Sequence, residues 1–159
     1  MTSQVITIAQ QKGGAGKTTL AAHLAVALAG PKKKVVAVDI DPQGSLSNWF
    51  EMRDEGTGNP EIRTVTGWRV STEVDRLRRD FDYVVVDSPP HAETDAKTAI
   101  RVADIVVIPV QPSPMDLWAT AATVDAAASE KTDALVVLNR VPPRANLADL
   151  ISGKVQELG

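Results

Sequence analysis

A glycine-rich stretch near the N-terminus, QQKGGAGKTT at residues 10–19, has the residue types that bind phosphate. Glycines allow backbone N–H groups to turn inward around an anion, and a helix that follows points its positive dipole end at the same place. Lys17 would reach the β- and γ-phosphates of a nucleotide, and the hydroxyl group of Thr18 would ligate magnesium. The sequence therefore predicts a P-loop whose nucleotide-binding residues are Gly13, Gly14, Ala15, Gly16, Lys17, Thr18 and Thr19.

This stretch departs from the usual P-loop pattern, G-x-x-x-x-G-K-[ST], at its beginning. Gln11 stands where the first glycine is expected, and a second lysine, Lys12, follows it. A lysine ahead of the glycines does not easily fold back onto the phosphate that its own loop wraps. We therefore expect the Lys12 charge to project outward from the crevice, where a second molecule facing this rim would receive it.

Three aspartates follow apolar runs in positions that suit a magnesium and phosphate site. Asp87 ends YVVVD and fits the Walker B arrangement, in which a carboxylate at a strand end supports the metal. Asp39 and Asp41 are two residues apart, so their side chains point to the same side of an extended segment. One can approach the metal while the other addresses a water near the γ-phosphate. Each aspartate alone could equally be an ordinary strand-end or turn residue, but three on one rim favour catalysis.

The elements that must position these residues alternate along the chain. Short β-branched runs occupy residues 5–9, 35–39, 83–87, 104–110 and 134–138, with a further short strand at 62–65. Helical segments lie between them at residues 17–30, 45–52, 71–80, 93–103, 116–130 and 146–158. This order predicts a single α/β domain over residues 1–159, with a doubly wound, mostly parallel sheet covered by helices on both faces. Its ligand crevice lies at the carboxyl ends of the strands.

The bulk composition excludes several other classes of protein. A net charge of −3 gives no overall attraction to nucleic acid or to an anionic membrane. The absence of cysteine excludes disulfides, iron–sulfur clusters and thiolate zinc sites. No apolar run approaches the roughly 18 residues of a membrane span, so we expect a cytoplasmic protein without a membrane partner.

Taken together, four segments resemble the ParA/MinD family of P-loop ATPases, which carry a deviant Walker A motif. KGGAGKTT at 12–19 matches that motif, VVAVDIDPQGSLSNW at 35–49 matches the family's second signature, and VVVDSPP at 84–90 looks like its Walker B segment. VVIPVQPSPMDL at 106–117 resembles the proline-containing loop of the small partition ATPases of plasmids and chromosomes.

The resemblance implies a P-loop NTPase fold that binds ATP or ADP with Mg²⁺ and forms an ATP-dependent homodimer. Lys12 of each subunit would reach the phosphates held by the other, and Asp41 would position the hydrolytic water. The implied catalytic residues are Lys12, Lys17 and Asp41, and the implied metal-supporting residues are Thr18, Asp39 and Asp87. Pro112 would lie near the nucleotide and the dimer interface, and Asn139 would contact adenine.

The resemblance also implies partners and a biological role. Hydrolysis would be weak in the isolated protein and stimulated by a centromere-binding, ParB-like partner, and the ATP dimer would bind non-specific DNA of the nucleoid. The cycle would segregate or position plasmid, chromosome or protein cargo. Family members usually continue with another strand and helix, so we expect this chain to lack them and to leave residues 134–138 as an apolar sheet edge.

Two other interpretations remain open from the sequence. A metabolic P-loop ligase of the dethiobiotin synthetase kind also ends its loop with G-K-T, although Lys12 and the DIDPQGS segment favour the ParA-type ATPase. A truncated, nucleotide-switched binding module that does not hydrolyse ATP is the third interpretation.

Overall fold

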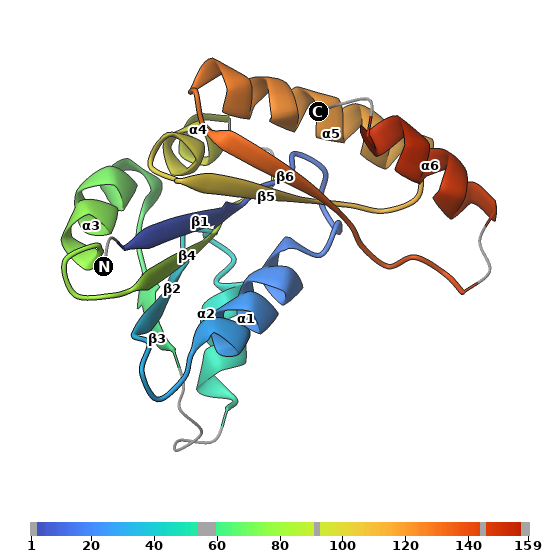
Figure 1. The fold of residues 1–159 in the computed structure, drawn as a ribbon. Coiled ribbons are helices and arrows are strands. Elements are labelled where there is room, and N and C mark those ends of the chain that lie inside the picture. Colours follow the sequence, from blue (N-terminus) through green and yellow to red (C-terminus); the bar gives the residue numbers. More distant parts are fainter. Residues whose placement is uncertain (1–2, 54–59, 91–92, 144–145, 157–159) are drawn as a thin grey trace.

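Six parallel strands form one sheet in the computed structural model, which describes residues 3–53, 60–90, 93–143 and 146–156. The strand order is β3-β2-β4-β1-β5-β6, so β1 lies in the interior of the sheet between β4 and β5 (Figure 1). The strands are β1 (Gln4–Ile8), β2 (Val35–Asp39), β3 (Glu61–Thr64), β4 (Tyr83–Asp87), β5 (Ile105–Val110) and β6 (Asp133–Leu138). Every pairing between them is parallel, which confirms the predicted sheet.

The described residues form six α-helices, of which five connect successive strands and lie on the two faces of the sheet, while the sixth follows β6 and contacts the helix before that strand (Figure 1). They are α1 (Lys17–Leu28), α2 (Ser45–Glu51), α3 (Val70–Leu77), α4 (Glu93–Arg101), α5 (Pro114–Ser129) and α6 (Asn146–Gln156), and a short 3₁₀ turn at Gly67–Arg69 precedes α3. The doubly wound P-loop architecture expected from the sequence is therefore confirmed. Among the described residues, no helix is long and apolar enough to cross a membrane.

Alternating side chains of the central strands divide the core between the two faces. In β2, Val35 and Ala37 pack with residues of α1 and α2, whereas Val36 and Val38 pack with residues of α3 and α4. Such strands are buried on both sides, which explains why their sequences are continuously apolar instead of alternating. The burial of both faces fixes the register of the strands, and with it the positions of the loops at their carboxyl ends.

The outer edge of β6 ends the sheet on one side. Its first three residues are exposed and its last three are half-buried, unlike the fully buried β2. Within the described residues, β6 therefore lies at an edge of the sheet.

Candidate functional site

The P-loop follows β1 and ends where α1 begins. Gly14 and Gly16 have φ angles of 78° and 95°, a left-handed conformation that glycine adopts without strain. Gly16 is the N-cap of α1, and no side chain caps the first turn of this helix. The free N–H groups and the positive end of the helix dipole therefore make this turn suitable for an anion such as phosphate.

Lys17 and Asp87 are both buried, and their surroundings shift the pKa of each side chain. Lys17 is only 7% exposed, and burial lowers its pKa, while the charges of Asp87 and Asp41 act in the opposite direction. Asp87 is 1% exposed, and burial raises its pKa to about 7 although a hydrogen bond from Thr18 opposes the rise. A bound polyphosphate would raise the pKa of Lys17 because its negative charge favours the charged form of the lysine.

Thr18 and Asp87 have the donor atoms that suit magnesium. The hydroxyl group of Thr18 donates to Asp87 Oδ2 over 2.7 Å. The other carboxylate oxygen, Oδ1, is buried and has no hydrogen-bond partner among the described residues. Within the described residues, no three His, Cys, Asp or Glu side chains group around a common point, so phosphate oxygens and water would have to complete the ligand shell. The residues present therefore fit a nucleotide-bound magnesium ion.

The two aspartates after β2 have different environments. Asp39 is fully buried, and its carboxylate accepts hydrogen bonds from the backbone N–H groups of Asp41 and Ser47 and from the Ser47 hydroxyl group, at 2.9–3.1 Å. It thus ties the loop to the first turn of α2, and its support of the metal stays a prediction. Asp41 is partly exposed and accepts a hydrogen bond from the backbone of Gln43 over 2.9 Å. Its charge acts to raise the pKa of both Lys17 and Asp87.

Lys12 lies against α5 of its own chain. Its Nζ donates to the carboxylate of Asp116, a residue that is almost fully buried and that also accepts a hydrogen bond from Ser113. Burial acts to raise the pKa of Asp116, but the hydrogen bonds from Lys12 and Ser113 outweigh it and keep the pKa below its usual value. The Lys12 side chain is 36% exposed. Its reach across to a second subunit stays a prediction.

Three polar side chains from the ends of β5 and β6 contact the P-loop backbone. Gln111 Nε2 and Arg140 Nη1 each donate to the carbonyl oxygen of Gly14 over 2.9 Å. Asn139 Nδ2 donates to the carbonyl oxygen of Ala15 over 2.9 Å. The adenine contact that the resemblance implies for Asn139 stays a prediction, and Gln111 and Arg140 are not among the predicted site residues. Their only signal in the sequence was their position directly after two strands.

The remaining predicted residues lie on the same rim. Gly13 is exposed, Ala15 is buried, and Thr19 is exposed on the first turn of α1. Pro112 follows β5 and is partly exposed next to Gln111.

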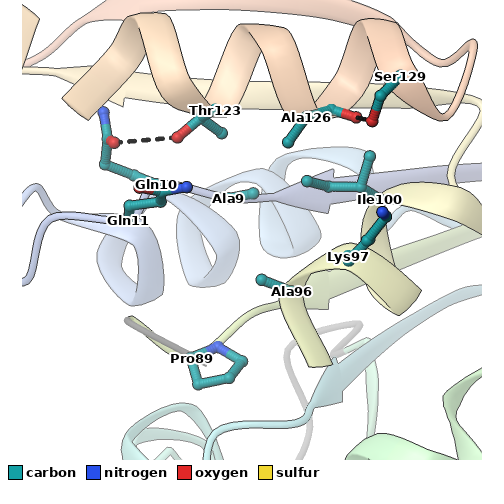
Figure 2. A pocket seen from close by; sticks show the side chains of 10 residues that line it. All are labelled: Ala9, Gln10, Gln11, Pro89, Ala96, Lys97, Ile100, Thr123, Ala126 and Ser129. Atoms are coloured by element: carbon teal, nitrogen blue, oxygen red, sulfur yellow. Dashed lines mark hydrogen bonds between the residues drawn. The ribbon is translucent and has the colours of Figure 1, made fainter. Parts of the chain in front are cut away.

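A groove of about 280 Å³ lies beside the start of the P-loop, between α4 and α5 (Figure 2). The side chain of Gln10 forms part of its wall and is itself buried. Its amide nitrogen donates to the Pro109 carbonyl oxygen and to Thr120 Oγ1, and its carbonyl oxygen accepts from Thr123 Oγ1. Gln10 therefore joins the end of β1 to α5, and this explains why a polar residue directly before the P-loop is buried.

The sequence of residues 6–157 matches the family described as CobQ/CobB/MinD/ParA nucleotide binding domain. The chain belongs to this family, which confirms its resemblance to the ParA/MinD-type ATPases. It is 32% identical over 164 residues to the maintenance of carboxysome distribution protein A of Halothiobacillus neapolitanus, covering 97% of this chain and 74% of the relative. A protein of the same name from Gloeobacter kilaueensis is 39% identical over 146 residues, covering 89% of this chain and 65% of the relative.

Solved structures of this family share the fold at low sequence identity. Cobyrinic acid a,c-diamide synthase from Mycobacterium smegmatis, solved with bound ADP and magnesium, has a TM-score of 0.85 at 18% identity, covering 98% of this chain and 81% of that one. The pNOB8 ParA protein bound to non-specific DNA has a TM-score of 0.75 at 20% identity, covering 98% and 74%. These similarities concern the architecture of the sheet and helices.

Proposed function

We propose that this chain binds Mg-ATP at the P-loop, hydrolyses it slowly, and uses the cycle to position a cargo. The observation that carries the proposal is the arrangement of Lys17, Thr18 and Asp87 beneath an uncapped helix N-terminus. A buried lysine and a buried aspartate with an unpartnered oxygen are costly in an empty pocket, and both costs fall when a metal-bound polyphosphate enters.

Each residue of the site has a defined task in this proposal. Backbone N–H groups of residues 13–16 bind the phosphate oxygens, and Lys17 places its charge on the β- and γ-phosphates. Thr18 and Asp87 would hold magnesium, which when bound neutralises charge on those phosphates. Asp41 would hold the attacking water in line with the γ-phosphate, because it is the aspartate of this rim that remains partly exposed.

The proposal includes an ATP-dependent homodimer, with Lys12 as the residue that enters the partner's site. Phosphoryl transfer depends on positive charge placed where negative charge develops, so a monomer that lacks the second lysine hydrolyses ATP slowly. ATP would favour the dimer and hydrolysis would release it, which changes affinity for a surface or partner during each cycle. We expect a ParB-like partner and non-specific DNA to act at that stage.

The relatives favour a particular kind of cargo. Two proteins that are at least 30% identical to this chain are named for maintaining carboxysome distribution. We therefore propose a large protein assembly as the cargo, ahead of a plasmid or chromosome.

The decisive experiment measures molar mass by light scattering with ADP, ATP and a slowly hydrolysed analogue, for wild type and for Lys12→Ala. We expect a dimer with ATP and with the analogue in the wild type, and a monomer under all conditions in the variant. Identical dimers in both proteins would remove Lys12 from the interface. ATP turnover without any dimer would favour the ligase interpretation.

Steady-state turnover provides the second measurement. Asp41→Ala should lower the ATPase rate by about 100-fold or more, because the water loses its positioning group. Asp75→Ala, which removes an exposed carboxylate from α3, serves as the matched control and should retain the wild-type rate. Equal and negligible rates in all three proteins would instead support a binding module without hydrolysis.

A further inference from the structure

We propose that Gln111, Asn139 and Arg140 are positioning residues that hold the P-loop in its phosphate-binding shape before nucleotide arrives. The inference rests on the proposed function of the P-loop as a nucleotide site. Residues at the carboxyl ends of β5 and β6 would thus organise the loop that follows β1.

The contacts fix two successive peptide groups of the loop. Gln111 and Arg140 hold the Gly14 carbonyl oxygen, and Asn139 holds that of Ala15. In a planar trans peptide the C=O bond and the following N–H bond point in opposite directions. Holding these two carbonyl groups outward therefore directs the N–H groups of Ala15 and Gly16 to the other side of the loop, where an anion can be bound.

A P-loop without these contacts can rotate its peptide groups. Glycine at three of the four positions 13–16 permits that rotation at low cost. A rotated peptide would present a carbonyl oxygen to the phosphate, and the two negative ends would repel each other. The contact from Arg140 opposes this rotation most strongly, because a hydrogen bond from a charged donor is stronger than one between neutral groups.

The backbone at the end of β6 is strained in a way that serves these contacts. Arg140 has a φ angle of 53°, which is uncommon for a residue with a side chain. Asn139 Oδ1 accepts a hydrogen bond from the Arg140 backbone over 3.0 Å, and the Asn139 backbone donates to the Val110 carbonyl oxygen over 2.8 Å. Such strain persists where surrounding contacts impose it, and here those contacts aim both side chains at the P-loop.

The close fit between Asn139 and Gly16 supports the same assignment. A Cβ atom added to Gly16 would clash with Asn139 Nδ2. A side chain at this position would therefore displace the Asn139 amide group and also strain the left-handed backbone. The P-loop and the end of β6 are therefore sterically complementary.

The test measures the affinity for ADP and for inorganic tripolyphosphate by calorimetry. In Arg140→Gly and in Asn139→Ala, both affinities should fall by about tenfold and by similar factors, because the two ligands share the phosphate cradle. Arg140→Gly also relieves the left-handed strain, so its melting temperature should not fall. Weaker binding without lower stability is a result that a merely structural role does not produce.

Lys131→Gly is the matched control. Lys131 has a φ angle of 59° and lies two residues beyond the end of α5, and none of its described contacts reaches the P-loop. This change relieves the same backbone conformation and should leave both affinities unchanged. Hydrogen exchange in ligand-free protein adds a readout without nucleotide: the amides of residues 13–16 should exchange faster in Arg140→Gly than in wild type or in Lys131→Gly.

The outcomes separate this inference from the proposed function. Unchanged affinities in Arg140→Gly and Asn139→Ala, together with unchanged exchange in Arg140→Gly, would overturn the positioning role alone. A loss confined to ADP would also overturn it, since it would make these residues contacts of the nucleoside. Wild-type protein that binds neither ligand would overturn the proposed function, and the positioning role with it.

Discussion

Asp87 is a buried carboxyl group whose proton makes stability depend on pH. Its pKa rises to about 7 in the folded protein because burial disfavours the charged form. In the unfolded chain the same group ionises near pH 4, roughly the ordinary value for aspartate. Between about pH 4 and pH 7 the folded state therefore binds a proton that the unfolded state has lost, so the contribution of Asp87 to stability falls as pH rises through this window.

Asp87→Asn should remove that loss of stability. The variant should melt closest to wild type at about pH 4, the lower limit of this window, and increasingly above wild type up to about pH 8. The full shift of about three pKa units corresponds to about 4 kcal/mol as an upper bound. Thermal unfolding of ligand-free, magnesium-free protein at several pH values measures it.

Asp125→Asn is the matched control, since Asp125 is exposed on α5. It should follow the wild-type dependence on pH throughout. A wild-type protein that becomes more stable relative to Asp87→Asn as pH rises would show that Asp87 is ionised in the empty site.

At the scale of elements, Arg78 joins the end of α3 to the turn before β5. Its guanidinium group donates to both carboxylate oxygens of Asp104 over 2.9 and 3.0 Å and to the Val102 carbonyl oxygen over 2.9 Å. Asp104 in turn accepts from the Val5 backbone of β1 over 2.7 Å. The sequence RLRR at residues 76–79 does not distinguish Arg78 from Arg79. In the structure Arg78 makes these contacts and is partly buried, whereas Arg79 is exposed.

Arg78→Ala should lower the free energy of unfolding by about 2 kcal/mol, because it removes several charge-assisted hydrogen bonds at once. Arg79→Ala should change it by less than about 0.5 kcal/mol, as is usual for an exposed site. Urea unfolding monitored by circular dichroism measures both. Equal changes in the two variants would mean that the Asp104 contact contributes no net stability.

The type and order of the elements could be predicted from the sequence, and so could the P-loop. Apolar runs and glycine positions are local signals, because each depends only on a window of about ten neighbouring residues in the sequence. The contacts between distant residues could not be predicted this way. Lys12 and Asp116 are 104 residues apart, and Gly14 lies 97 residues from Gln111 and 126 from Arg140. Such pairs depend on the strand order β3-β2-β4-β1-β5-β6, which continuously apolar strands do not reveal.

At the scale of the whole molecule, the rim that would face a second copy carries a lysine already held by its own chain. Lys12 contacts Asp116, so its transfer to a partner's phosphates requires that ion pair to open. The cost of opening the pair counts against the dimer, and a change at Asp116 should alter dimerisation without touching the P-loop.

Asp116→Asn should allow the ATP dimer to form at about fivefold lower protein concentration, because the partly exposed ion pair contributes about 1 kcal/mol. Sedimentation or light scattering across a concentration series in ATP measures it. Asp125→Asn removes the same charge from the same helix, away from Lys12, and should leave the midpoint in place. A weaker dimer in Asp116→Asn would indicate that Asp116 presents Lys12 to the partner instead of retaining it.

The contact between the P-loop and the end of β6 has a consequence for the order in which the protein becomes functional during synthesis. A chain made from its N-terminus contains all its phosphate-binding glycines long before it contains Arg140, which follows Gly14 by 126 residues. The P-loop thus leaves the ribosome well before the residue that holds it in its working shape. A growing chain would then bind nucleotide with full affinity only after β6 and Arg140 have joined the sheet.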